Sequence, residues 1–186
     1  MKVSVIGVGL IGGSFALAIK ESFPESTIFG IDKSEAHVKE ALEIGFIDAA
    51  GTMEDLADSD VAIVAVPVDI RIKVLKEALD NAGDHTLVID AGSTKFKLCE
   101  AVKDHPKRRN YLSSHPIAGT ENTGPSTAVE GLFAKKVAII CQKEMSAEPA
   151  LELVEALYKV LDMRIIYMDP KEHDLHIAYV SHLSHI

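Results

Sequence analysis

The chain has 186 residues, 47% of them hydrophobic and 25% charged, which provides enough apolar material for one full domain or for one domain and the start of another. The formal net charge of −9 argues against a nucleic acid as the main partner, and no apolar run approaches the roughly 18 residues that cross a membrane. The amino terminus carries no secretory signal pattern, and the two cysteines, far apart, suggest neither a disulfide framework nor a CxxC site, so the cytoplasm is the expected compartment.

Apolar runs of strand length alternate along the chain with amphipathic segments of helix length. The predicted strands are 3–6, 27–31, 61–66, 86–90, 111–113, 137–141 and 164–167, and the predicted helices are 10–22, 34–44, 53–57, 69–81, 95–103, 147–161 and 170 onward. Gly45 is expected to end the second helix, and Ser146 to cap the sixth. The early strands are continuous apolar runs, which is typical of strands covered by helices on both faces. The sequence therefore predicts an α/β fold with a Rossmann-type, doubly wound, mainly parallel sheet.

The last segment has the pattern of a new helix. Asp169, Pro170 and Glu172 are typical of a helix N-terminus, with the aspartate as the cap and the proline in the first turn. The helical pattern then runs to Ile186 without a signal that would end it. We therefore expect residues 1–168 to form one domain, and residues 169–186 to be the first helix of a second domain that continues in the natural protein.

A glycine-rich turn follows the first predicted strand. Gly7, Gly9 and Gly12 fit the pattern GxGxxG directly before a predicted helix, and Asp32 follows twenty residues after Gly12, at the end of the second strand. Gly7 permits a tight turn, Gly9 lets a pyrophosphate approach the backbone, and Gly12 lets the helix pack close to the sheet. This context predicts a dinucleotide site, and the alternative is that the glycines serve only a tight turn.

The residues around this turn indicate which dinucleotide binds. The backbone N–H groups at the start of the helix, at Leu10 and Ile11, attract the phosphates. A carboxylate at Asp32 can accept hydrogen bonds from the adenosine ribose and repels a 2′-phosphate, so NAD is predicted in preference to NADP. Val66 and Pro67, at the end of the third predicted strand, are expected to line the same site.

Polar side chains follow the ends of the later strands. Ser93 comes after the fourth predicted strand, Ser114 and His115 come after the fifth, and Thr120 and Glu121 lie in the loop beyond them. If these strands run parallel to the first, their ends line one crevice beside the nicotinamide. His115 is predicted to be the base, because a neutral imidazole can take the proton of an alcohol that NAD+ oxidises. Ser93 is predicted to orient that hydroxyl or the imidazole.

These polar residues also have purely structural interpretations. His115 could cap a turn before Pro116. Ser93 and Thr94 could cap the helix that follows them, and Asp90 could only hold its own loop. The residues alone leave these alternatives open.

Four histidines, His173, His176, His182 and His185, fall in the last predicted helix. At 100° per residue, the nine positions between His173 and His182 place these two on opposite faces, so a four-histidine metal site is not expected and no metal is predicted. Either one face of this helix closes over the crevice, or the histidines belong to a polar or interfacial helix face.

Four segments, in this order and spacing, resemble the prephenate dehydrogenase family: GVGLIGGSFALAIK, DAGSTK, SSHPIAGTE and HDLHIAYVSHLSH. The resemblance covers essentially the whole chain and is most specific in HPIAGTE and SHLSH. It implies a Rossmann domain, here 1–168, followed by an all-helical dimerisation domain that begins within 169–186. It also implies a homodimeric enzyme of tyrosine biosynthesis that oxidises prephenate, or arogenate, with NAD+ or NADP+ and with loss of carbon dioxide.

The resemblance also assigns roles to individual residues. His115 matches the catalytic histidine, and Ser93 matches a serine that contacts the ring hydroxyl of the substrate. Glu121 matches an acidic residue near the substrate entrance, and His182 and His185 match histidines at the domain junction. The arginine that holds the substrate carboxylate belongs to the family's helical domain, so we expect these 186 residues to bind NAD but to turn over poorly or not at all.

The substrate that this resemblance implies is a dicarboxylate, which a chain of net charge −9 does not attract by its overall field. Local cations must attract it, and Lys95 and Lys97 are candidates beside those of the second domain. Two rival functions fit the same sequence. One is another Rossmann dehydrogenase, such as a β-hydroxyacid dehydrogenase, which relies on a catalytic lysine and lacks HPIAGTE. The other is a non-catalytic NAD-binding module.

Overall fold

The computed structural model describes residues 1–119 and 122–183, with the backbone alone for 180–183. Within these residues, eight strands form one sheet in the order β3-β2-β1-β4-β5-β6-β7-β8. The strands are β1 (Lys2–Ile6), β2 (Thr27–Ile31), β3 (Ala49–Ala50), β4 (Val61–Val64), β5 (Leu87–Asp90), β6 (Tyr111–Pro116), β7 (Val137–Cys141) and β8 (Arg164–Met168). All neighbouring pairs are parallel except β6 and β7, which confirms the predicted mainly parallel sheet.

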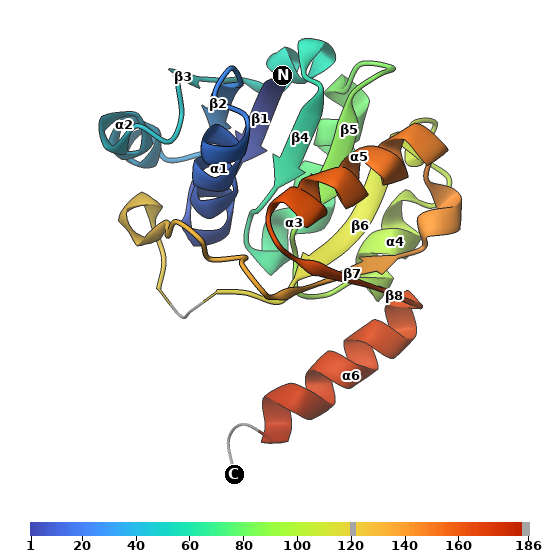
Figure 1. Ribbon diagram of the computed structural model, residues 1–186. Helices are drawn as coiled ribbons and strands as arrows, with labels where there is room; N and C mark the ends of the chain where they lie inside the picture. The colour runs from blue at the N-terminus through green and yellow to red at the C-terminus, as the bar shows by residue number, and fades with distance from the viewer. Residues whose placement is uncertain (120–121, 184–186) are drawn as a thin grey trace.

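Helices cover both faces of this sheet. They are α1 (Leu10–Ser22), α2 (Glu35–Ile44), α3 (Val68–Asn81), α4 (Phe96–Val102), α5 (Glu148–Val160) and α6 (Pro170–Leu183), with short 3-10 turns at η1 (Met53–Asp58), η2 (Arg108–Asn110), η3 (Pro125–Thr127) and η4 (Lys143–Met145). Figure 1 shows α1 and α5 in front of the sheet and α3 and α4 behind it. Because both faces are covered, all four residues of β4 are buried, as its continuous apolar sequence predicts.

The two faces carry separate apolar cores. On one face, Phe15 of α1 packs against Phe133 with ring centroids 4.3 Å apart, and Leu157 of α5 belongs to the same cluster. On the other face, Leu79 of α3 and Leu98 of α4 belong to a second cluster. The sheet therefore stands between two apolar layers, which is the arrangement of a doubly wound fold.

Two predicted helix ends have different outcomes. Gly45 ends α2 with a φ of 91°, and its N–H donates to the carbonyl of Ala41 at 3.0 Å, which confirms the predicted terminator. Ser146 does not cap α5, which begins after Ala147 without a side-chain cap. The Ser146 hydroxyl instead donates to the carbonyl of Tyr111 at 2.6 Å, so this prediction was wrong because the residue is tied to the start of β6.

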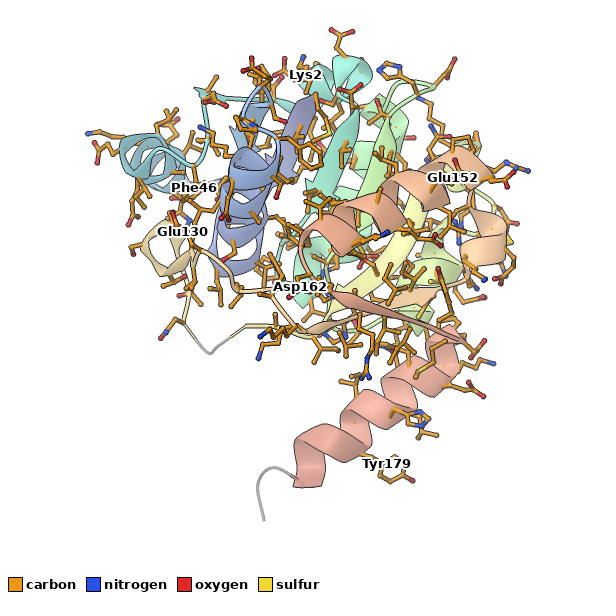
Figure 2. The ribbon with its side chains drawn as sticks, viewed as in Figure 1. Lys2, Phe46, Glu130, Glu152, Asp162 and Tyr179 are labelled. Atoms are coloured by element: carbon orange, nitrogen blue, oxygen red, sulfur yellow. The ribbon has the colours of Figure 1, made fainter. Side chains whose placement is uncertain are left out.

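Helix α6 begins as predicted and leaves the body of the domain. The Asp169 carboxylate accepts from the backbone N–H groups of Lys171 at 2.8 Å and Glu172 at 3.2 Å. Figure 1 shows α6 projecting from the end of the sheet toward which β1, β4, β5 and β6 point, and Figure 2 shows Tyr179 on its projecting part. Leu175 and Tyr179 are 56% and 64% exposed there. Among the described helices, none is long and apolar enough to cross a lipid bilayer.

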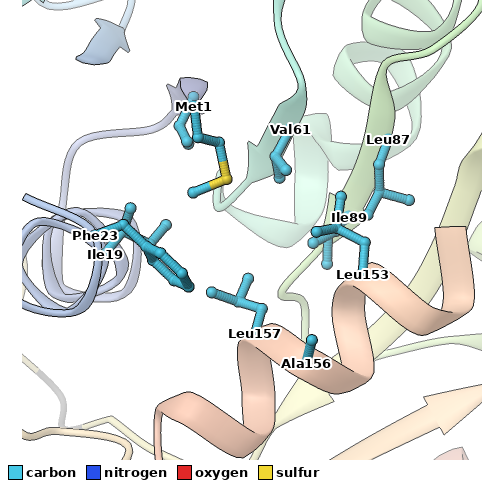
Figure 3. A pocket seen from close by; sticks show the side chains of 10 residues that line it. Met1, Ile19, Phe23, Val61, Leu87, Ile89, Leu153, Ala156 and Leu157 are labelled. Atoms are coloured by element: carbon cyan, nitrogen blue, oxygen red, sulfur yellow. The ribbon is translucent and has the colours of Figure 1, made fainter. Parts of the chain in front are cut away.

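An apolar hollow lies at the opposite end of the sheet. It has a volume of about 150 Å³ and lies between α1 and α5, where Met1, Phe23 and Leu157 line it (Figure 3). Each of its lining residues is apolar, so it offers no group that would hold a phosphate or a carboxylate. The candidate site is therefore sought at the other end, where the parallel strands terminate.

Candidate active site

The turn between β1 and α1 depends on two glycines. Gly7 has a φ of 92°, and a Cβ at this residue would lie 2.6 Å from the carbonyl oxygen of Ala65. A Cβ at Gly12 would lie 2.0 Å from the carbonyl oxygen of Gly7. Helix α1 therefore starts in direct backbone contact with the turn that precedes it. Its first N–H groups point out of the carboxyl edge of the sheet, where a phosphate can reach them.

A cavity of about 470 Å³ opens at this turn. Seven of the eight residues that the sequence predicts to bind the cofactor line it: Gly7, Gly9, Leu10, Ile11, Asp32, Val66 and Pro67. The eighth, Gly12, lies in the packed contact beneath the turn. Sequence reasoning missed the apolar wall, which includes Met53, Ile70 and Val74 from η1 and α3. These residues come from segments whose packing on the sheet no local motif reports.

Asp32 connects the glycine turn to the end of β2. One carboxylate oxygen accepts from the N–H of Val8 at 3.2 Å, and the other accepts from the N–H of Ser34 at 2.9 Å. A carboxylate has about four acceptor positions, so two remain for hydroxyl donors on the cavity side. His37 and Lys33 line the same part of the cavity, with the His37 ring 3.7 Å from the Asp32 carboxylate.

The segment that leaves β6 runs back over the glycine turn. A Cβ at Gly119 would lie 3.4 Å from the Ile11 side chain, and Asn122, Thr123 and Gly124 line the cavity. Thr120 and Glu121, both predicted to face the substrate, lie outside the described residues. The ends of β1 and β6 are three strand spacings apart, or about 14 Å. The cavity at the glycine turn and the end of β6 thus lie at the same edge of the sheet.

His115, near the end of β6, is partly buried and hydrogen-bonded to a second histidine. Its Nδ1 lies 2.8 Å from Nε2 of His173, which is fully buried on α6. Nδ1 of His173 lies 2.8 Å from the Asp174 carboxylate. Burial first, and then the ammonium of Lys95, lower the pKa of His115 to about 3. The imidazole is therefore neutral at neutral pH, as a base must be.

The sequence places His173 on the last predicted helix, for which a face that closes over the crevice is one of two interpretations, but no local pattern connects it with His115. The available signal was the adjacent pair His173 and Asp174 in the first turn of α6, directly after the cap. His176 lies one turn on, is exposed, and contacts the carbonyl of Glu172 through Nδ1 at 2.7 Å. His182 lies in the part of α6 whose side chains are not described, and His185 lies outside the described residues. No group of three metal-binding side chains is present among the residues described.

Ser93 and Ser114 lie in different surroundings. Ser93 is exposed on the loop after β5, and α4 begins beyond it without a side-chain cap from Ser93 or Thr94. Ser114 is fully buried. Its hydroxyl donates to the carbonyl of Asp90 at 2.8 Å and contacts the hydroxyl of Tyr158 on α5. Ser93 is therefore exposed to solvent beyond β5, whereas Ser114 is tied to the interior.

A buried ion pair lies beneath His115. The Lys95 ammonium is fully buried, contacts the Asp90 carboxylate and donates to the carbonyl of Ser114 at 2.6 Å. The hydroxyl of Tyr111 donates to the same carboxylate at 2.6 Å, and burial raises the pKa of Tyr111 well above its usual value. Lys95 therefore cannot meet an incoming dicarboxylate, and the suggestion that it attracts the substrate was wrong. Its buried positive charge instead lowers the pKa of His115.

Arg71, on α3, joins the ends of β4 and β5. Its guanidinium donates to the carbonyl of Val66 from Nε at 3.1 Å and from Nη2 at 2.8 Å. It also packs flat on Gly92, where a Cβ would lie 2.0 Å from Nη1. Sequence analysis did not single out either residue. The glycine in DAGSTK thus makes room for an arginine that holds the loop carrying Ser93.

Comparison with known proteins gives a consistent family assignment. Residues 15–167 match the family model described as prephenate dehydrogenase, nucleotide-binding domain. The chain is 35% identical, over 99% of its length, to the prephenate dehydrogenase of Bacillus subtilis (strain 168). It spans about half the length of the first curated relatives that it matches, and 51% of the Bacillus protein. A crystal structure of prephenate dehydrogenase from A. aeolicus in complex with hydroxyphenyl propionate and NAD+ superposes with a TM-score of 0.86 at 26% identity, covering 100% of this chain and 70% of that one. The crystal structure of Synechocystis arogenate dehydrogenase superposes with a TM-score of 0.88 at 25% identity. The match covers 98% of this chain and 65% of that one.

Proposed function

The chain belongs to the prephenate dehydrogenase family, and from that premise we propose that the protein containing it oxidises prephenate to 4-hydroxyphenylpyruvate with NAD+. In this reaction the ring carbon that bears the hydroxyl loses a hydride and the hydroxyl loses its proton. The ring carboxylate leaves as carbon dioxide, its bonding electrons make the ring aromatic, and the resulting phenolate oxygen takes the proton back to give the hydroxyl of the product. The observation that carries the proposal is that a cavity at a dinucleotide-type turn and a neutral, partly buried histidine lie at the same edge of one sheet.

The turn fits the cofactor by its packing. Gly12 lets α1 start against the turn, and Gly9 leaves its Cβ position open: among the residues that the structure describes, the nearest atom is the backbone nitrogen of Gly124, at 3.9 Å. A pyrophosphate can therefore approach the backbone between Gly9 and the first turn of α1. Asp32 retains acceptor positions for the adenosine ribose, which favours NAD over NADP. Bound there, NAD+ supplies the hydride acceptor.

His115 takes the hydroxyl proton in this proposal. A positioned general base contributes about 10²- to 10⁴-fold to such a step, and aromatisation supplies the driving force for the loss of carbon dioxide. Ser93, exposed in the loop after β5, contacts the same hydroxyl. Glu121, Thr120, His182 and His185 stay proposed substrate contacts. Ser114 receives a structural role here, because its hydroxyl is used between Asp90 and Tyr158.

The test uses the intact protein and follows NADH formation with prephenate, with arogenate and with a small β-hydroxyacid. We expect prephenate to give the highest kcat/KM. The variant His115→Asn should lower kcat by about 10²- to 10⁴-fold and leave the NAD+ dissociation constant within about two-fold. His85→Asn, in the exposed loop before β5, is the matched control and should leave both unchanged.

Three results would redirect the proposal. Faster turnover of arogenate would change the substrate within the family. Turnover of only the β-hydroxyacid would favour the other Rossmann dehydrogenases. Binding of NAD+ without turnover of any substrate would favour a non-catalytic module. We also expect a cytoplasmic homodimer, which light scattering of the intact protein can test.

A further inference from the structure

A chain of three side chains extends behind the proposed base. It runs from His115 on β6 to His173 and Asp174 on α6, with 2.8 Å between the bonded atoms at each step. Asp174 is anchored in turn by α4, because its two oxygens accept from the backbone N–H groups of Lys95 at 2.7 Å and Phe96 at 3.0 Å. His173 is fully buried and meets the ring of His115 edge-on, with centroids 5.1 Å apart.

The hydrogen bonds determine where the protons lie, starting from Asp174. Burial alone would raise the pKa of Asp174, but hydrogen bonds from His173 and from two backbone N–H groups outweigh it, and the pKa lies below its usual value. An ionised carboxylate only accepts, so Nδ1 of His173 carries a proton. Burial lowers the pKa of His173, so its ring is neutral and its Nε2 is an acceptor.

The same argument passes to His115. Because Nε2 of His173 accepts, Nδ1 of His115 must donate across the 2.8 Å contact. A neutral imidazole has one N–H, so the lone pair of His115 is then on Nε2, the nitrogen that does not bond to His173. That is the atom a substrate hydroxyl needs.

We propose that His173 and Asp174 are positioning residues that hold His115 in the tautomer with its proton on Nδ1, so that Nε2 is the atom that accepts the substrate proton. The proposal rests on the proposed function for its catalytic consequence, but the tautomer itself is a property of the protein alone. When His115 takes up the proton, its new charge faces the Asp174 carboxylate through His173. Lys95 and Arg71 are the cations that oppose this new charge.

The arrangement also links the base to the helix that leaves the domain. Asp174 occupies the position where a serine or threonine cap of α4 is expected, and it is 79 residues from Lys95 in the sequence. The contact of α6 with the start of α4 and the tautomer of His115 thus depend on the same residue, Asp174. Displacing α6 would remove the acceptor of the His115 proton.

The direct test is ¹⁵N NMR of the intact protein labelled with ¹⁵N-histidine at neutral pH, with the His115 signals assigned through His115→Asn. We expect a protonated Nδ1 and an unprotonated Nε2 at His115. The variant His173→Phe should shift His115 toward protonated Nε2. His173→Gln, whose amide oxygen can accept from Nδ1, should keep the original tautomer. A His115 with its proton on Nε2 in the unmodified protein would overturn the proposal, whether or not any variant folds.

Kinetics give the second readout. His173→Phe should lower kcat by about 10²- to 10⁴-fold, the range expected when a base is held in the wrong tautomer, with NAD+ affinity unchanged. His173→Gln should recover most of this loss, and His176→Phe, one turn along the same helix and exposed, should show none. Full activity in His173→Phe would refute the positioning role. If the unmodified protein turns over none of the substrates, the proposed function fails while the NMR result still decides the tautomer.

Discussion

The substitution Gly12→Ala separates the packing of α1 from the helix propensity of its sequence. A Cβ at this residue would lie 2.0 Å from the carbonyl oxygen of Gly7 and 2.8 Å from the Val5 side chain, whereas ordinary contact begins at 3.4 Å. The helix must therefore move by about 1.4 Å from a backbone atom that cannot rotate away. Such overpacking costs about 1–3 kcal/mol or more, against about 1 kcal/mol gained from alanine in a helix.

Because the clash is with the backbone, we expect a cost at the upper end of this range, about 3 kcal/mol, and a net loss of about 2 kcal/mol, which lowers the Tm of a domain of this size by about 4–8 °C. The same movement withdraws the first N–H groups of α1 from the pyrophosphate. Losing one charge-assisted hydrogen bond of about 1.5–3 kcal/mol weakens NAD+ binding by about 10- to 150-fold.

Gly13→Ala is the matched control for this prediction, because it gains the same helix propensity one residue along. Its Cβ would meet Ala128 at 2.7 Å and the Phe46 ring at 3.0 Å, which belong to a loop and to a side chain rather than to the glycine turn. We expect a smaller loss of stability and nearly unchanged NAD+ affinity, measured by thermal unfolding and by calorimetric titration. Equal effects of the two substitutions on both quantities would refute the reasoning.

Three further predictions concern charge. The substitution Asp32→Ser should weaken the binding of NAD+ by about 10- to 150-fold and strengthen the binding of NADP+. Calorimetric titration with both cofactors measures this preference, and an unchanged preference would show that the assignment of Asp32 is wrong. Lys95→Met leaves Asp90 buried without its cation and should cost about 3–5 kcal/mol in urea unfolding; the double variant Asp90→Asn/Lys95→Met should lose clearly less, and an equal loss would contradict the ion-pair explanation. Because the folded-state pKa values of His115 and His173 lie below the value of about 6.5 in unfolded chains, the unfolded protein binds more protons below that pH. The free energy of unfolding should therefore fall as the pH drops below 6.5, by about 1.4 kcal/mol per pH unit for His115 alone. The variant His115→Asn should lose stability less steeply, and identical pH profiles would speak against a neutral, buried His115.

Local motifs predicted the cofactor end of the crevice well. The glycine turn and Asp32 are close in sequence, and their geometry follows from two adjacent strands and one helix, so the pattern in the residues carries the three-dimensional arrangement. The continuous apolar runs likewise gave the parallel sheet. The antiparallel β7 could not be recognised, because its apolar run has the same length and composition as its parallel neighbours.

The side chains at the proposed substrate site were harder to predict from the sequence, as Ser114 shows. The predicted strand stopped at residue 113, but β6 continues to Pro116. Neighbouring residues of a strand point to opposite faces, so Ser114 faces α5 and Tyr158 while His115 meets α6. A strand end misplaced by three residues thus changes which side chains belong to the crevice.

Contacts across long stretches of sequence were invisible to pattern reasoning. His115 and His173 are 58 residues apart, and the cap that Asp174 provides for α4 spans 79 and 78 residues. The motif DAGSTK alone suggests that Lys95 faces solvent. The fold shows that its ammonium is buried, where it contacts the Asp90 carboxylate and the Ser114 carbonyl. The residues that shift the pKa of His115 come from α3, from the loop before α4 and from α6, which no single motif joins.

A crystal structure of the protein with NAD+ bound tests the central claim most directly. The account predicts that the adenosine ribose meets Asp32, that the pyrophosphate lies on the first turn of α1, and that C4 of the nicotinamide lies beside Nε2 of His115, close enough for one substrate ring to contact both. A nicotinamide ring directed away from the end of β6, or a His115 whose Nε2 is turned into the protein interior, would contradict it.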